Sequence, residues 1–183
     1  MPKYKTTAYG EAIYPHLTHP DTAFSSDGIY QVKLRLHKDK ATADLKAIED
    51  TISLQVAEAH KKNPKNTKMV KRAPKPYKED GDDVILHFKC KAKGINGETG
   101  KPFEQKPVLL DNNLDRLSED KLIYGGSVMS IKYEPVGYNV ASTGIGCTLR
   151  LKGAHIVKLV EGETDTSGWT KVDPKEYESR LPK

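Results

Sequence analysis

The fold is decided by the stretch Val128-Met129-Ser130-Ile131-Lys132-Tyr133-Glu134-Pro135-Val136-Gly137-Tyr138-Asn139, followed by Gly146-Cys147-Thr148-Leu149-Arg150-Leu151-Lys152. Apolar and polar residues alternate in both segments, which is typical of half-buried β-strands. The residues between the strands predict a loop with Tyr138 at its mouth. Arg150 and Lys152 share one face of the second strand, because side chains alternate with period two. Cations in a row beside loop aromatics are typical of proteins that hold single-stranded nucleic acid.

Length and charge indicate one polar domain with a polyanionic partner. At 183 residues the chain can form one good core and is too short for two comfortable domains. Hydrophobic residues make up 36% and charged residues 30%, which indicates a globular rather than a disordered chain. The net charge is +5, of which residues 1–160 carry +7 and residues 161–183 carry −2. A basic body of this kind suggests a polyanionic partner.

Signals for catalysis, metal binding and membrane insertion are missing from the sequence. Cys90 and Cys147 are the only cysteines, so no CxxC zinc pair exists, and both are expected to be buried free thiols. The segment from Gly97 to Pro102 fails as a phosphate-binding loop, because proline follows Lys101 and no helix is expected there. No apolar run approaches 18 residues. We therefore expect no enzyme activity, no metal, no cofactor, no membrane span and a cytosolic location.

Two segments alternate cleanly and carry basic residues on their outer face. In residues 29–37 the outward side chains are Gln31, Lys33, Arg35 and His37, and in residues 84–93 they are His87, Lys89, Lys91 and Lys93. Further strands are expected at about 3–17, 103–111, 127–134 and 145–160, the last with a bulge near Gly153.

Between these strands the period changes. Apolar residues recur at spacings of three and four over residues 41–61, which predicts a helix of about five turns with a core-facing stripe. Residues 61–78 then hold eight bases, no acids and three prolines, which predicts a mobile basic loop. That loop is either a solvated linker or an arm that grips phosphate.

Five or six strands with one inserted helix predict a mainly β fold. A small, partly open barrel removes exposed sheet edges, so the OB-fold is the leading candidate, and a β-sandwich with an inserted helix is the alternative. The domain is expected to span residues 1–160, followed by a loosely held, mildly acidic tail at 161–183.

With the strands laid out, the chain resembles the bacteriophage T7-type single-stranded DNA-binding protein family. The resemblance rests on three ordered blocks between about residues 8 and 160: Gly10–Asp21 with Gly28–Leu34; Lys75-Pro76-Tyr77 with Phe88–Ala92; and Tyr124–Ser127, Ile131–Tyr133 and Tyr138-Asn139 with Leu149–Leu151.

The resemblance implies an OB-fold protein that coats and protects transient single strands during phage DNA replication, recombination and repair, in the cytoplasm of the infected bacterial host. It also implies an acidic tail that engages replication proteins, such as a polymerase or helicase-primase, and supports a homodimer. This sequence ends in Arg180-Leu181-Pro182-Lys183 and its last residues are only mildly acidic, so the sequence leaves the replication partners and the homodimer undecided.

Candidate contacts with single-stranded DNA follow from the residues and the resemblance together. The residues expected to stack on bases are Tyr14, Tyr138 and Tyr77, and those expected to contact phosphate are Lys33, Arg35, Lys89, Lys91, Lys132, Arg150 and Lys152. For each lysine the alternative is a solvated strand face, and for Tyr14 and Tyr138 it is packing against the end of the barrel. Two other functions remain open: an RNA-binding OB or cold-shock-like module, and a protein-interaction module whose basic face meets an acidic partner.

Overall fold

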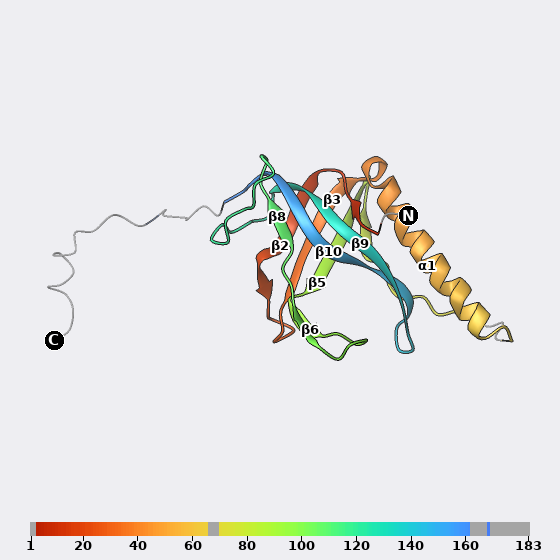
Figure 1. The fold of residues 1–183 in the computed structure, drawn as a ribbon. Helices are drawn as coiled ribbons and strands as arrows, with labels where there is room; N and C mark the ends of the chain where they lie inside the picture. Colours follow the sequence, from red (N-terminus) through yellow and green to blue (C-terminus); the bar gives the residue numbers. More distant parts are fainter. Residues whose placement is uncertain (1–2, 66–69, 162–167, 169–183) are drawn as a thin grey trace.

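The structure is a computed structural model that describes residues 3–65, 70–161 and 168. Figure 1 shows a β-barrel with one long helix beside it. The elements in chain order are β1 (Lys5–Thr6), β2 (Gly10–Asp21), β3 (Ile29–His37), a 3-10 turn (Lys38–Lys40), α1 (Thr42–Lys62), β4 (Tyr77–Asp80), β5 (Asp83–Lys91), β6 (Lys93–Ile95), β7 (Pro102–Glu104), β8 (Val108–Leu110), β9 (Val128–Val140) and β10 (Gly144–Lys158). The tail expected at 161–183 lies, apart from Glu161 and Gly168, outside the described residues.

Five of the strands form a barrel. β2 pairs with β3, β3 with β5, and β9 with both β2 and β10, all antiparallel, while β5 and β10 run parallel. The barrel is only partly closed, because β2 and β9 pair through Gly10 and Glu11 alone, and β5 and β10 through Phe88 and Lys89 alone. A partly open, five-stranded barrel in which one pair of neighbouring strands, β5 and β10, runs parallel is the OB-fold. The OB-fold prediction is confirmed, and the β-sandwich alternative is wrong.

The core follows from the alternation along the strands. In β3 and β5 every second side chain is buried, among them Leu34, Leu86 and Phe88, none of which has any exposed surface. Each such side chain contributes about 1.5–3 kcal/mol relative to an exposed one. Cys90 and Cys147 are buried free thiols, as expected, and burial raises the pKa of each to about 11. Neither thiol is therefore ionised at neutral pH.

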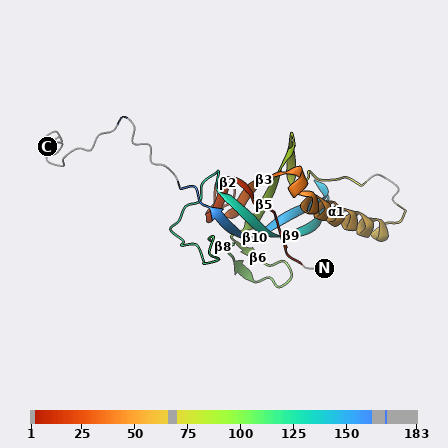
Figure 2. The same cartoon turned by 90° about the horizontal axis from the view of Figure 1, so that it is seen from above.

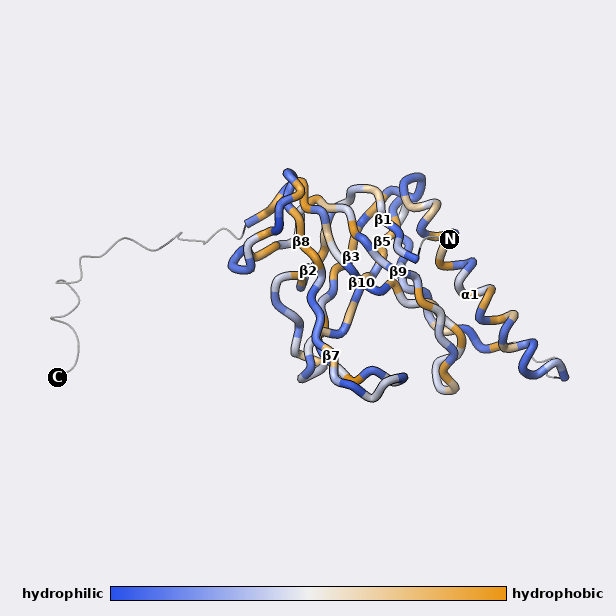
Figure 3. Tube along the Cα trace, in the orientation of Figure 1, coloured by the Kyte–Doolittle hydropathy of each residue, from blue (hydrophilic) through white to orange (hydrophobic). Residues whose placement is uncertain are grey.

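Helix α1 packs on β9 and β10 through its expected apolar stripe, of which Ile48 and Ile52 are buried. One acidic residue lies on the same face: Asp44 is buried and accepts a hydrogen bond from the Tyr133 hydroxyl at 2.5 Å. Burial raises the pKa of Asp44. Figure 2 shows the C-terminal part of α1 extending past the barrel, and Figure 3 shows hydrophobic and hydrophilic residues alternating along it. In the described part of the chain, no helix has the length and apolarity needed to cross a membrane.

Strand β9 continues to Val140, whereas the sequence predicted a strand that ends near residue 134. The ladder with β10 runs on through Pro135 and pairs Tyr138 with Gly146. A Cβ atom at Gly146 would lie 2.5 Å from the Tyr138 ring, so the ring occupies the space that the glycine leaves open. The predicted loop position of Tyr138 is therefore wrong, because an aromatic ring across from a glycine stabilises continued pairing.

The segment expected to be a basic loop is shorter than predicted. Lys61 and Lys62 belong to α1, and Tyr77 and Lys78 belong to β4. The Ala73 amide donates to the Ile145 carbonyl at 2.8 Å, which ties this segment to the start of β10. Residues 66–69 lie outside the described residues.

The strand expected at 103–111 is divided into two. β7 pairs with β6 in a separate hairpin, with Ile95 opposite Pro102, whereas β8 runs parallel to β10, with Val108 opposite Gly153. The residues between them turn the chain from the hairpin back to the barrel. The β6–β7 hairpin thereby stands away from the barrel wall (Figure 1).

Candidate nucleic-acid interface

Strand register brings several of the predicted cations close together on the outside of the barrel. Gln31 on β3 lies opposite Lys89 on β5, and Lys89 lies opposite Arg150 on β10. One step along, Lys33 lies opposite His87. Residues in register on neighbouring strands are adjacent on one face. We call the side chains Lys33, Lys89, Lys91, Lys132, Arg150 and Lys152, which come from β3, β5, β9 and β10, the basic face.

A groove runs between the basic face and the β6–β7 hairpin. Its volume is about 530 Å³, and Lys89, Lys91 and Arg150 line one side. Ile95 and Phe103 of the hairpin line the other side, so the groove has one basic and one partly apolar wall. Such a groove suits an unpaired strand, because phosphates are attracted to the cations while bases contact the apolar wall.

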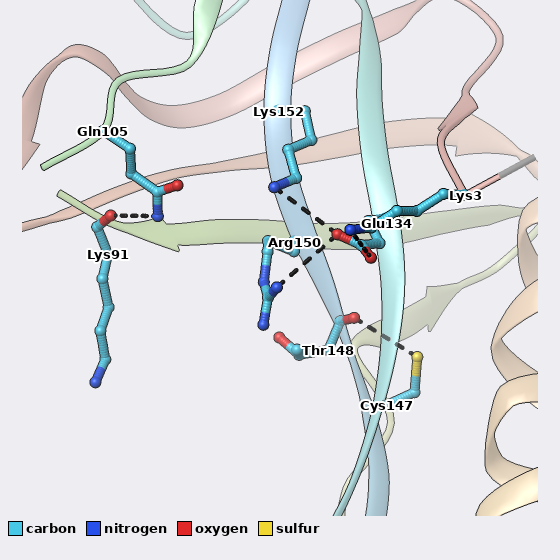
Figure 4. A network of polar contacts seen from close by, with 8 residues as sticks. All are labelled: Lys3, Lys91, Gln105, Glu134, Cys147, Thr148, Arg150 and Lys152. Carbon is cyan, nitrogen blue, oxygen red and sulfur yellow. Dashed lines mark hydrogen bonds and ion pairs between the residues drawn. The ribbon is translucent and has the colours of Figure 1, made fainter. Parts of the chain in front are cut away.

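An acidic side chain lies among these cations. Figure 4 shows Lys3, Arg150 and Lys152 converging on Glu134, which is opposite Arg150 in the β9–β10 ladder. The Glu134 carboxylate lies 3.4 Å from the Lys3 ammonium and 3.8 Å from both the Arg150 guanidinium and the Lys152 ammonium. Its side chain is only 13% exposed. Glu134 therefore orients these cations and competes with phosphate for them.

His87 occupies the basic face between two lysines. Its Nε2 lies 2.9 Å from Gln31 Oε1, and the Gln31 amide donates in turn to Asp21 at 3.0 Å. Burial, followed by repulsion from Lys89 and Lys33, lowers the pKa of His87 to about 4. His87 is therefore neutral at pH 7 and adds no charge to this face.

Arg35 is placed differently from the other predicted cations. It lies opposite Ile85, near the β4–β5 turn, where acidic residues cluster. Its guanidinium is 2.8 Å from the Asp80 carboxylate and 3.3 Å from that of Asp83. The sequence showed Arg35 on the same outer row as Lys33 but not the carboxylates that the β4–β5 hairpin brings to it. The structure does not bring Arg35 into the groove.

The three predicted stacking tyrosines have different surroundings. Tyr14 is 78% exposed and has a positive φ of 47°, at an irregularity in the β2–β3 ladder. It lines a hollow of about 310 Å³ together with His16, Lys33 and His87, at the edge of the basic face. A solvent-exposed ring held by an unusual backbone conformation is available for stacking.

Tyr77 and Tyr138 are both half-buried. Tyr77 packs against the core, and Lys75 lies 5.5 Å from its ring centroid and 3.2 Å from its hydroxyl. Tyr138 covers Gly146, as described above. Both side chains therefore have a packing role, and their stacking role stays a prediction.

In the described part of the chain, four exposed aromatic residues were not predicted as site residues: Tyr4, Tyr9, Phe24 and Tyr124. Phe24 is 95% exposed in the β2–β3 loop, and Tyr4 is 43% exposed just before β1. A large apolar residue inside turn chemistry was the available signal for Phe24, and the run Lys3-Tyr4-Lys5 was the signal for Tyr4. Phe24 lies among turn residues and Tyr4 at the start of an expected strand without clean alternation, so neither was expected to form part of a site.

The structure combines a partly open five-stranded barrel, a basic groove across its strands and exposed aromatics at its edges. Together these features define the class of OB-fold proteins that hold single-stranded nucleic acid. Comparisons with known proteins agree. A family model described as the single-stranded DNA-binding protein of bacteriophage T7 matches residues 9–159. The chain belongs to this family.

Two relatives support the assignment, and two solved structures share the fold. The single-stranded DNA-binding protein of Enterobacteria phage T3 is 30% identical over 186 residues, covering 91% of this chain and 79% of that protein. That of Escherichia phage T7 is 26% identical with the same coverage. The crystal structure of gp2.5, a single-stranded DNA-binding protein encoded by bacteriophage T7, has a TM-score of 0.71 at 22% identity, covering 98% of this chain and 95% of that one. The single-stranded DNA-binding protein of bacteriophage Enc34 in complex with single-stranded DNA has a TM-score of 0.54 at 18% identity, covering 88% and 90%.

Proposed function

We propose that this chain binds single-stranded DNA, largely independently of sequence, and protects transient single strands during phage DNA replication, recombination and repair. One observation carries the proposal: strand register joins cations of β3, β5 and β10 into the basic face beside a groove of about 530 Å³. Lysine and arginine side chains supply affinity by releasing counterions from the phosphates, with no dependence on base identity. Family membership supports the same function.

The proposed mechanism is binding without chemistry. Phosphates contact the basic face, while bases turn toward the β6–β7 hairpin or toward exposed rings such as Tyr14. Stacking contributes about 1–3 kcal/mol per base and tolerates any sequence, because every base has an aromatic face. Duplex DNA hides its bases, so only the phosphate contacts remain available to it.

Partners and location belong to the proposal as well. Homodimer formation and recruitment of phage replication proteins, such as a polymerase or helicase-primase, are proposed by analogy with the family. The same holds for the cytoplasm of the infected bacterial host as the place of action. The names of the T3 and T7 relatives support a phage setting.

The test is fluorescence anisotropy with labelled oligonucleotides of one sequence as single-stranded DNA, duplex DNA and RNA, across a salt series. We expect tighter binding to single-stranded DNA than to duplex at every salt concentration, and a log–log slope of about −0.7 per phosphate contacted. Equal affinity for duplex and single strand would refute the assignment. Preference for RNA would favour the RNA-binding alternative, and no binding at all would favour a protein-interaction module.

A further inference from the structure

We infer that the structure holds a separate pocket for one unstacked nucleobase, with Tyr4 as its stacking platform. This inference rests on the proposed function and adds a subsite to it. The pocket, which we call the Tyr4 pocket, has a volume of about 390 Å³ and lies over the β9–β10 ladder between β1 and β8. That volume is within the range of about 300–1,000 Å³ typical of small-molecule sites.

The walls of the Tyr4 pocket are suited to a flat aromatic group. Val108 and Leu110 of β8 form one side, Tyr4 lies on the other, and Ala154 contributes to the lining. β8 approaches closely because β10 has a glycine there: a Cβ atom at Gly153 would lie 2.6 Å from the Val108 carbonyl oxygen. A mostly apolar slot with a few polar groups is the usual form of a pocket that buries an organic ring.

Three ammonium groups surround the Tyr4 ring. Those of Lys132, Lys152 and Lys3 lie 5.5, 5.7 and 5.7 Å from its centroid. These cation–π contacts hold the ring in place, although the side chain is 43% exposed. The same ammonium groups offer positive charge to phosphates on either side of a base that enters the pocket.

A β-bulge connects this pocket to the groove. The β9–β10 register shifts between Leu151 and Gly153, which leaves Lys152 as the extra residue. Lys152 stays on the outer face with Arg150, and the alternation breaks just after it, where Gly153 and Ala154 are both buried. Lys152 lines both the Tyr4 pocket and the groove beside the basic face, so one strand can pass from one to the other.

The pocket wall also carries an unpaired polar atom. His155 lines the pocket, and its Nδ1 lies 2.8 Å from the Tyr9 hydroxyl. Its Nε2 is buried and has no hydrogen-bond partner among the described residues. A base edge that reached this nitrogen would remove the free-energy cost of leaving it unpaired.

The experiment compares Tyr4→Ala, Tyr4→Phe and Lys132→Gln with the wild-type chain, by anisotropy on the shortest oligothymidylate that binds with full affinity. We expect Tyr4→Ala to weaken binding at least about fivefold with an unchanged salt slope, because stacking releases no counterions. Tyr4→Phe should bind within about twofold of wild type, since it keeps the ring. Lys132→Gln should instead make the salt slope shallower. Leu54→Ala, which removes an exposed apolar side chain from α1, is the control and should bind like wild type.

An abasic scan of the same oligonucleotide locates the base. One abasic position should weaken binding to the wild type but not to Tyr4→Ala, because the lost base and the lost ring belong to one contact. The pocket proposal is overturned if Tyr4→Ala binds like wild type, or if both proteins show the same abasic profile. If Arg150→Ala still weakens binding in that case, the proposed function stands without the pocket. If the wild type fails to bind single-stranded DNA, both proposals fail.

Discussion

Replacing His87 by glutamine tests whether the basic face is organised as the structure shows. The unfolded chain takes up a proton at His87 near pH 6.5, whereas the pKa of the folded imidazole is lowered to about 4 by burial and by Lys89 and Lys33. Acid therefore favours the unfolded chain, and stability is lost as the pH falls from about 6.5 to about 4. Since one pKa unit corresponds to about 1.4 kcal/mol, the loss is about 2 kcal/mol at pH 5 and about 3 kcal/mol near pH 4.

The assay is urea denaturation of the wild type and His87→Gln at pH 7.5, 6, 5 and 4.5. Glutamine can donate the hydrogen bond to Gln31 but does not titrate, so the difference between the two proteins isolates His87. Asp44 acts in the opposite direction, because its raised pKa favours the folded state as the pH falls, and this effect cancels in the difference. His60→Gln, on the exposed end of α1, is the matched control. Parallel losses of stability in the wild type and His87→Gln would refute the reasoning.

The same variant links the site to binding. Phosphates held by Lys33 and Lys89 would cancel the repulsion that these lysines exert on His87, and so raise its pKa in the complex. If the pKa of His87 is one unit higher in the complex than in the free protein, binding at pH 5 is about twofold tighter than it would be without this change. Anisotropy titrations at pH 7.5 and 5 should show this gain in the wild type and not in His87→Gln. An equal gain in both proteins would mean that the strand passes elsewhere.

Three further outcomes are expected. Arg150→Ala should make the log–log salt slope of binding shallower by up to about 0.7. Arg35→Ala should leave that slope nearly unchanged, because the Asp80 and Asp83 carboxylates already hold its guanidinium. Equal changes of slope in the two variants would contradict the placement of Arg150 on the basic face and Arg35 outside it. Glu134→Gln should tighten binding and make the salt slope steeper by up to about 0.7, because it removes the carboxylate that competes with phosphate for Arg150 and Lys152. Weaker binding would show instead that Glu134 acts mainly by orienting these cations. Tyr138→Ala should lower the free energy of unfolding by roughly 1–2 kcal/mol in urea titrations, because the Tyr138 ring is half-buried over Gly146. If the folded variant binds DNA with wild-type affinity, Tyr138 is not part of the binding site.

Clean alternation and a regular apolar stripe were enough to predict two of the strands and the helix. β3 begins and ends where residues 29–37 predicted, and α1 lies within one residue of its predicted bounds. These elements were predictable because burial of one face imposes a period of 2 on a strand and 3.6 on a helix. The basic outer row of Lys33, Lys89 and Lys91 followed from the same alternation. The β9 extension was not predictable, because Pro135 and Gly137 are usual signs of a loop.

Which of the cations lie together depends on how distant strands pair, and no local pattern reveals that pairing. Arg35 and Lys33 have the same sequence pattern, yet register places Arg35 beside Asp80 and Asp83 and leaves Lys33 on the basic face. Tyr4 gained its surroundings because β1 pairs with β9, more than a hundred residues away, which places its ring beside Lys132 and Lys152. Periodicity reports which face of an element is buried, whereas pairing between distant strands fixes which side chains meet.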